Sequence, residues 1–164
     1  MKIHYRLLKE EDVDGIFEIS SLSFKTPWSY ESIKSEINNP LAKYIVALDL
    51  DNKKIIGFIG AWIIASEADI VNIAVHPKYR NLGIGSKLLS SFIELGRNED
   101  WYKITLEVRE SNLSAQSLYL KYNFKVDGIR KNYYEDTKEN AILMSHLYSW
   151  QVTTFNWQMT GYRL

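Results

Sequence analysis

The sequence predicts a mixed α/β fold in which helices pack on a mixed β-sheet. Segments with the two-residue alternation of strands take turns along the chain with segments whose apolar residues recur at helical spacing. The 164 residues contain neither an internal repeat nor a low-complexity linker, and 46% of them are hydrophobic. Because single domains commonly run to about 100–200 residues, we expect one continuous domain with a full core.

The first three predicted elements are a strand and two helices. Residues 3–7 alternate as a strand does. A helix is expected over residues 11–24, with these apolar residues near one face: Val13, Ile16, Phe17, Ile19 and Phe24. Ser29 can cap a second helix, which ends at Asn39-Pro40 because proline cannot continue it.

Three strands are predicted next. Residues 44–48 and 55–65 are typical of a hairpin around the polar turn 49–52. A strand over residues 70–75 then leads into a turn marked by proline and a loop that contains two glycines.

The second half of the chain predicts two more helices and three strands. A helix over residues 84–95 repeats apolar residues at helical spacing: Ile84, Leu88, Leu89, Phe92 and Leu95. A strand over 103–109, a short helix over 113–122 and strands over 126–133 and 141–147 complete the pattern. The predicted order is β-α-α-β-β-β-α-β-α-β-β.

Composition and charge exclude several classes of protein. Twenty basic residues balance twenty acidic ones, which argues against a duplex nucleic-acid binder that relies on a broad basic face. The absence of cysteine excludes disulfides, thiolate zinc sites and cysteine nucleophiles, and the three histidines lack metal-ligand spacing, so no metal is predicted. The N-terminus lacks an apolar run of signal-peptide length, and the apolar stretch 55–65 is too short to span a bilayer. We therefore expect a cytoplasmic protein.

The most informative segment is the glycine loop after the strand 70–75. Arg80 supplies a positive charge, while Gly83 and Gly85 lack Cβ atoms and let the backbone wrap closely around a ligand. The N–H groups at the start of the next helix then point at bound phosphate, and the helix dipole adds to the attraction. The loop thus predicts a site for a phosphate-bearing cofactor, although its glycines can also serve turn geometry alone.

Two kinds of nucleotide loop are excluded by what this segment lacks. A Walker A loop requires a glycine four residues before a Gly-Lys-Ser, which is missing here. A dinucleotide loop requires a third glycine where Leu88 stands, and an acidic residue roughly 20 residues further on at the end of a second strand.

The strand after the glycine-loop helix carries charged residues. Its apolar residues share one face, which places Glu107 and Arg109 on the other. A charged side chain in a central strand requires an oppositely charged partner, contact with water or a catalytic role. Glu107 is therefore either a candidate catalytic residue or one member of an ion pair with Arg109 or Lys103. Asn112 is a natural helix cap, and the helical spacing around Tyr119 also suits a core aromatic.

Short motifs follow one another over most of the chain. They are Pro27-Trp28-Ser29, Asn72-Ile73-Ala74-Val75-x-Pro77, Arg80-x-x-Gly83-x-Gly85, Leu106-Glu107-Val108-Arg109-x-Ser111-Asn112, Leu118-Tyr119 with Asn123-Phe124, and Arg130-x-Asn132-Tyr133-Tyr134. In order and spacing the set resembles bacterial N-terminal acetyltransferases of the GNAT superfamily. The resemblance implies one GNAT domain over residues 1–148, with a mostly antiparallel twisted sheet and flanking helices. Residues 149–164 extend past it without an assigned role.

The resemblance also implies a cosubstrate, an acceptor and site residues. Glu107 would be the general base and Tyr119 the general acid. Acetyl-CoA would be held by Ile73, Ala74, Val75, Arg80, Asn81, Leu82, Gly83, Ile84, Gly85, Ser86 and Asn112. Asn81 departs from the family pattern, where a long polar or basic residue is more usual. The implied acceptor is a protein N-terminus, that of a ribosomal protein beginning with alanine or another small residue.

This chemistry requires these residue types. A protein α-amine has a pKa of about 7.7–8.0, so a carboxylate must remove a proton before the amine can attack a thioester. A backbone N–H of the strand 72–75 is the expected donor to the oxyanion, and a phenol can protonate the departing CoA thiolate. Neither a metal nor a covalent enzyme intermediate is needed.

Aromatic residues from two segments are candidates for the acceptor slot. Trp28 and Tyr30 lie at the start of the second helix, while Tyr133 and Tyr134 follow a strand. Together they could grip a peptide backbone and exclude bulky first residues, or simply cover the core.

Two other functions remain open. One is a GNAT enzyme that acetylates a small amine or lysine. The other is a non-catalytic acyl-CoA-binding module, in which Glu107 and Tyr119 are structural. We expect neither nucleic acid nor membrane as a required partner, and the sequence does not predict the oligomeric state.

Overall fold

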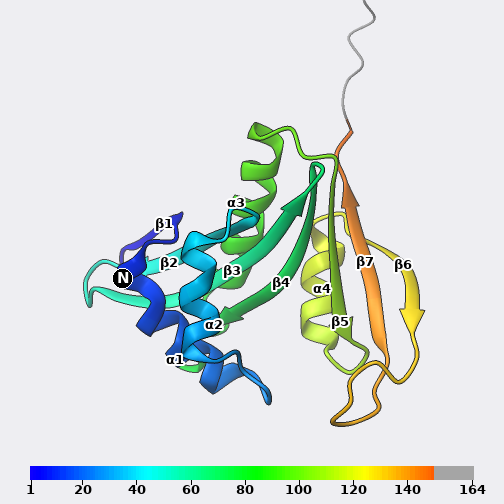
Figure 1. Cartoon of the computed structure of the whole chain (residues 1–164), viewed down its shortest axis with the longest axis horizontal. Coiled ribbons are helices and arrows are strands. Elements are labelled where there is room, and N and C mark those ends of the chain that lie inside the picture. The colour runs from blue at the N-terminus through cyan, green and yellow to red at the C-terminus, as the bar shows by residue number, and fades with distance from the viewer. Residues whose placement is uncertain (150–164) are drawn as a thin grey trace, which may run out of the picture.

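The computed structural model describes residues 1–149, which form a sheet of seven strands in the order β1-β2-β3-β4-β5-β7-β6 with helices on both faces (Figure 1). The elements are β1 Ile3–Leu7, α1 Val13–Ser23, α2 Tyr30–Ser35, β2 Ala42–Asp49, β3 Lys54–Ile64, β4 Glu67–Val75, α3 Ile84–Asn98, β5 Lys103–Arg109, α4 Leu113–Lys121, β6 Lys125–Arg130 and β7 Ala141–Leu147. This order confirms the predicted one. Apart from Ser149, the predicted C-terminal extension lies outside the described residues.

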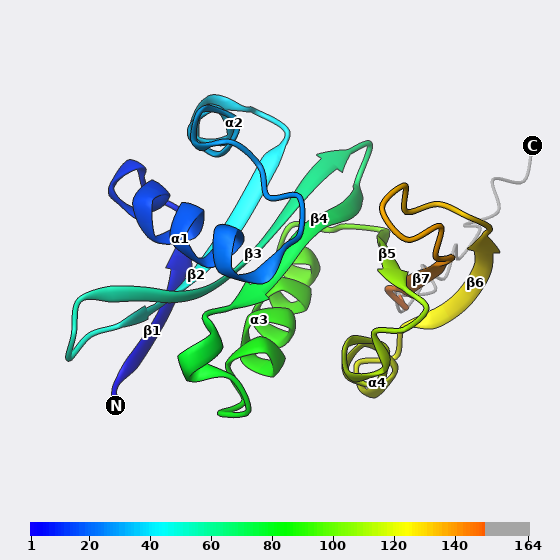
Figure 2. The same cartoon turned by 90° about the horizontal axis from the view of Figure 1, so that it is seen from below.

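The sheet is antiparallel except between β4 and β5, which confirms the expected mixed sheet. The parallel pairing of β4 with β5 covers only four residue pairs and ends at Ile70 opposite Leu106. On its other side β4 pairs with β3, and the register skips Val71, which marks a β-bulge. Because a bulge bends its strand and increases the local twist, β4 turns away from β5 at this point. Figures 1 and 2 show the two strands parting.

Each face of the sheet carries its own helical layer. Seen from below, α1 and α2 lie on one face, while α3 and α4 lie on the other (Figure 2). The buried side chains divide in the same way, and β3 contributes to both sets: Ile55 and Phe58 belong to the cluster with α1, Ile56 and Ile59 to the cluster with α3. Burial on both faces explains why β3 is apolar almost throughout.

Local sequence signals account for the helix boundaries. The Oγ of Ser29 accepts a hydrogen bond from the N–H of Ser32 at 3.1 Å, so Ser29 caps α2 as expected. The helix predicted over 11–24 is instead a 3₁₀ turn, Glu10–Asp12, followed by α1. Phe17, expected on its apolar face, is 36% exposed and contacts the ring of Tyr30.

The strand expected over residues 126–133 is shorter than predicted. β6 ends at Arg130, because Asn132 adopts a left-handed conformation with φ of 53° and its N–H bonds the side chain of Asn140. Residues 131–140 form a loop instead of a continuing strand.

Among residues 1–149, no helix combines the length and the apolar character that crossing a bilayer requires.

His146 is a polar residue inside the core. The residue is 9% exposed, its ring packs between Phe124 and Tyr148, and Nδ1 lies 2.9 Å from the carbonyl oxygen of Tyr122. In the neutral ring Nδ1–H can donate to this carbonyl. Burial lowers the pKa of His146, since the charged ring is poorly solvated there.

This burial predicts a pH dependence of stability. Because the pKa is lower in the folded protein than in the unfolded chain, protons bind preferentially to the unfolded chain, and stability is lost as the pH falls below the ordinary histidine value of about 6.5. We expect the free energy of unfolding to fall more steeply from about pH 7 to about pH 5 in the wild type than in His146→Asn. The asparagine amide keeps a donor near Tyr122 but does not titrate. Urea unfolding over this range measures both slopes, and equal slopes would contradict the prediction.

Candidate active site

Two cavities meet where β4 and β5 part. The smaller, of about 350 Å³, lies between the glycine loop, the start of α3 and α4, and is called the groove. The larger, of about 530 Å³, lies between the α1–α2 loop, β4, β5 and the loop before β7, and is called the cleft. Both are lined by Ile73, Asn112 and Tyr119. A ligand in the groove can therefore meet a ligand in the cleft at these residues.

The groove exposes bare backbone at the start of α3. Gly83 has φ of 77°, a left-handed conformation that favours glycine, and the preceding left-handed residue is Asn81, which tolerates φ of 61° better than most residues. Gly85 is different. A Cβ there would come no closer than 3.7 Å to Val75 and 3.9 Å to Leu118, so packing does not require glycine at this position.

The first turn of α3 has the features of an anion site. No side chain caps it, and it contains no acidic residue. The first N–H groups of a helix have no partner within the helix, so those beside Gly85 can turn to a ligand in the groove. The hydroxyl of Ser86 lies 2.7 Å from that of Tyr122, which ties the start of α3 to the end of α4. These features suit a phosphate group.

Arg80 lines the groove but also supports it. Its Nε donates to the carbonyl oxygen of Val75 at 3.1 Å, and its Nη2 donates to the Oγ of Ser23 at 3.1 Å. The guanidinium thus joins the glycine loop to the end of β4 and the end of α1. All other predicted cofactor residues also line the groove except Leu82, which is 59% exposed.

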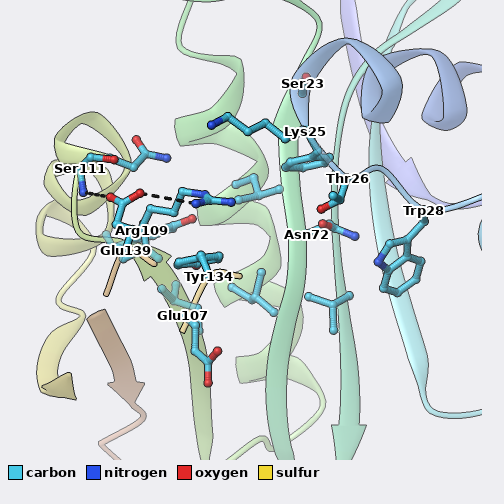
Figure 3. A pocket seen from close by; sticks show the side chains of 18 residues that line it. Ser23, Lys25, Thr26, Trp28, Asn72, Glu107, Arg109, Ser111, Tyr134 and Glu139 are labelled. Carbon is cyan, nitrogen blue, oxygen red and sulfur yellow. Dashed lines mark hydrogen bonds and ion pairs between the residues drawn. The ribbon is translucent and has the colours of Figure 1, made fainter. Parts of the chain in front are cut away.

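Glu107 lines the cleft from β5, and its partner comes from β6. Its Oε1 lies 3.1 Å from Nη1 of Arg130. A hydrogen bond to Glu107 raises the pKa of Tyr133, because it stabilises the protonated phenol. Figure 3 shows the carboxylate directed away from Arg109 and Tyr134. The ion pair considered from the sequence, with Arg109 or Lys103, is therefore replaced by a pair with Arg130.

Tyr119 belongs both to the core and to the site. It projects from α4, packs against Phe124 at a ring distance of 5.6 Å, and is only 5% exposed. Burial raises its pKa to about 12, since the phenolate is poorly solvated there. The phenol therefore stays protonated at neutral pH.

The four candidate aromatics of the acceptor slot separate into two pairs. Trp28 and Tyr134 line the cleft. Tyr30 does not line it, because its hydroxyl donates to Asp14 at 2.9 Å over the surface of α1. Tyr133 also does not line it, and it stands beside the Glu107–Arg130 pair, 43% exposed.

Sequence reasoning missed several residues of the cleft. The wall formed by the α1–α2 loop includes Lys25 and Thr26, and the opposite wall includes Arg109 and Glu139 (Figure 3). Asn72 lines the cleft from β4. Thr26, Asn72 and Arg109 stand in or next to the motifs quoted above, and that position was the signal available in the sequence. Glu139 joins the cleft only because the loop 131–140 folds back onto β5.

The arrangement suits the transfer of a group from a phosphate-bearing donor to a nucleophile. The groove offers an anion site, the cleft holds a carboxylate that can accept a proton, and a buried phenol stands where the two meet. Within the described part of the chain, no three histidine, aspartate or glutamate side chains gather to hold a metal ion.

Comparison with known proteins gives consistent matches over most of the chain. Residues 13–124 match the Acetyltransferase (GNAT) family. A Bacillus subtilis (strain 168) protein is 41% identical over 144 residues, which cover 87% of this chain and 94% of that protein. A Haemophilus influenzae protein named ribosomal protein bS18-alanine N-acetyltransferase is 36% identical over 137 residues, covering 82% of this chain and 91% of that protein.

Solved structures show the same similarity in three dimensions. The ribosomal-protein-S18-alanine N-acetyltransferase of Escherichia coli superposes with a TM-score of 0.85 at 28% identity, covering 93% of this chain and 98% of that one. The PaiA N-acetyltransferase of Thermoplasma acidophilum, solved in complex with coenzyme A, gives a TM-score of 0.72 at 25% identity, covering 90% and 100%.

Proposed function

This chain belongs to the GNAT acetyltransferase family, and on that premise we propose that it transfers the acetyl group of acetyl-CoA to the N-terminal α-amine of a protein. The proposed acceptor is a ribosomal protein that begins with alanine or another small residue, and the reaction is cytoplasmic. The names of the Haemophilus influenzae and Escherichia coli relatives support this choice of acceptor. The observation that carries the proposal is that the groove and the cleft meet at Tyr119, with Glu107 on the cleft side.

The groove is the proposed site of acetyl-CoA. GNAT acetyltransferases use acetyl-CoA, and one structural neighbour was solved with coenzyme A. The N–H groups beside Gly85 would hold its pyrophosphate, and the absent Cβ leaves room for it. Arg80 would add a positive charge while keeping the loop in place through Val75 and Ser23.

Glu107 is the proposed general base. At neutral pH much of an N-terminal amine is protonated, and a carboxylate in the cleft can take this proton directly or through water. Its Oε1 is paired with Nη1 of Arg130 at 3.1 Å, which holds the carboxylate at the side of the cleft.

Tyr119 and the backbone of β4 are proposed to stabilise the negative charges that develop on the sulfur and on the acetyl oxygen during transfer. The phenol, protonated at neutral pH, can donate a hydrogen bond and then its proton to the departing sulfur. Beyond Ile70, β4 has lost β5 as a strand partner, so N–H groups on that side of residues 71–75 can face the acetyl oxygen.

The acceptor is tested with a panel of short peptides and small amines, read by mass. We expect transfer to a peptide that begins with alanine or serine, and no transfer when its α-amine is blocked and a lysine is left free. Trp28→Ala should raise KM for the peptide more than KM for acetyl-CoA, because Trp28 lines the cleft but not the groove. If lysine peptides or spermidine react as well as N-terminal peptides, the alternative acceptor is correct.

The proposed base and acid are tested with substitutions that keep size and shape. Glu107→Gln and Tyr119→Phe should each lower kcat by something like 10²–10⁴-fold, the usual contribution of general acid–base catalysis. Affinity for acetyl-CoA and thermal stability should change little. Glu94→Gln, which alters an exposed pair with Arg97 on α3, is the matched control. Near wild-type turnover of Glu107→Gln would make Glu107 a structural residue, as in the non-catalytic alternative.

The cofactor site is tested by calorimetric titration with acetyl-CoA. Gly85→Val should weaken binding more than Arg80→Ala, because the valine side chain fills the groove whereas Arg80 contributes a partly screened charge. Gly128→Val is the control, since Gly128 has open space around it on β6. Absence of binding by the wild type, or tighter binding of ATP or NAD, would remove the basis of the proposal.

A further inference from the structure

Arg109, the last residue of β5, holds the loop 131–140 by several side chains at once. Its Nη1 and Nη2 donate to the two carboxylate oxygens of Asp136 at 3.1 and 3.0 Å. Nη1 also donates to Thr137 at 3.2 Å and lies 3.5 Å from an oxygen of Glu139. The guanidinium carbon lies 3.9 Å from the ring centroid of Tyr134, a cation–π contact. One guanidinium therefore fixes much of this loop.

The loop has few other ties to the sheet. Its internal backbone bonds run between Tyr134 and Glu139 and between Lys138 and Tyr134. At its end, Asn140 bonds Glu110 through backbone and side chain. Besides its backbone bonds with Glu139 and Lys138 and a ring contact with Tyr133, Tyr134 is joined to β5 by its contact with Arg109.

Glu139 links the same guanidinium to the strand-to-helix turn. Its other carboxylate oxygen accepts the N–H of Ser111, and Figure 3 shows this bond and the contact with Arg109 in one line. Gln116 further fixes the backbone of Arg109 by donating to its carbonyl oxygen at 3.1 Å. Glu139 and Gln116 thus hold Arg109 in place independently of its contact with Tyr134.

Both walls of the cleft meet at this cluster. Tyr134 and Arg109 line one wall, while Lys25 lines the other and lies 3.8 Å from Asp136. A displaced Asp136 would therefore alter the loop and its contact with the opposite wall together.

We propose that Arg109 is a positioning residue for the acceptor, which fixes Tyr134 and Asp136 so that the loop 131–140 forms one wall of the cleft. The inference rests on the proposed function, because it takes the cleft to be the site of the acceptor peptide. Arginine is required here and lysine is not sufficient, since only the planar fork can reach both oxygens of Asp136 while its face lies on Tyr134.

The test separates binding of the peptide from the chemical step. In Arg109→Lys, KM for an N-terminal alanine peptide should rise on the order of tenfold, while kcat and the Kd of acetyl-CoA stay within about twofold. Arg97→Lys, on an exposed pair with Glu94, is the matched control and should change neither. A drop in kcat with unchanged peptide KM would overturn the proposal.

A double-mutant cycle tests whether Arg109 acts through Tyr134. If it does, Arg109→Lys combined with Tyr134→Ala should raise peptide KM no more than Tyr134→Ala alone. Full additivity would show that Arg109 acts independently of Tyr134 and would overturn the assignment. Should Arg109→Lys fail to fold, Asp136→Asn removes one half of the fork on the loop and should raise peptide KM in the same direction.

A readout without turnover separates this inference from the proposed function. Trypsin should cleave the folded full-length chain after Lys131 and Lys138 faster in Arg109→Lys than in the wild type, because the loop loses its anchor. If the wild type acetylates no N-terminal peptide, the proposed function fails. If it does, but peptide KM and loop cleavage are unchanged in the variants, the role of Arg109 fails.

Discussion

The site depends on the parting of β4 from β5. Parallel pairing holds the two strands together only as far as Ile70 and Leu106, and the bulge at Val71 then bends β4 away. α3 and α4 lie on one face of the sheet beside this opening, and Tyr119 of α4 is buried there. The hydroxyl contact between Ser86 and Tyr122 holds these helices at a fixed spacing. The groove, the cleft and every candidate catalytic group lie at this break in the sheet.

The site is also part of the core, which constrains its chemistry. Tyr119 packs with Phe124 and lines both cavities, so the low polarity that raises the pKa of its phenol comes from the packing of the core. Glu107 lies on the more polar side, where Arg130 provides an opposite charge. Tyr119 is a buried phenol on a helix and Glu107 a paired carboxylate on a strand, and this difference follows from their places at the same opening.

Much of the fold follows from the sequence because its signals are local. Apolar periodicity fixed the order of the elements, and the glycine loop with its following helix located the groove. Gly83 adopts a left-handed conformation that favours glycine, whereas packing does not require glycine at Gly85, a distinction that only the coordinates make. The order of strands in the sheet, and the contacts between segments distant in sequence, could not be predicted from local patterns. β7 inserts between β5 and β6, which brings Arg130 to Glu107 and leaves Arg109 to the loop 131–140. Spacing could not reveal that Tyr30 bonds Asp14, or that Leu82 faces solvent.

The groove and the cleft are lined by different layers of the molecule. The groove is lined from the side of α3 and α4, and the cleft from the side of the α1–α2 loop, so two cavities that share Ile73, Asn112 and Tyr119 are bounded by elements on opposite faces of the sheet. Ligands in the two cavities can therefore approach each other at the shared residues, while the rest of each ligand lies on a different face of the sheet.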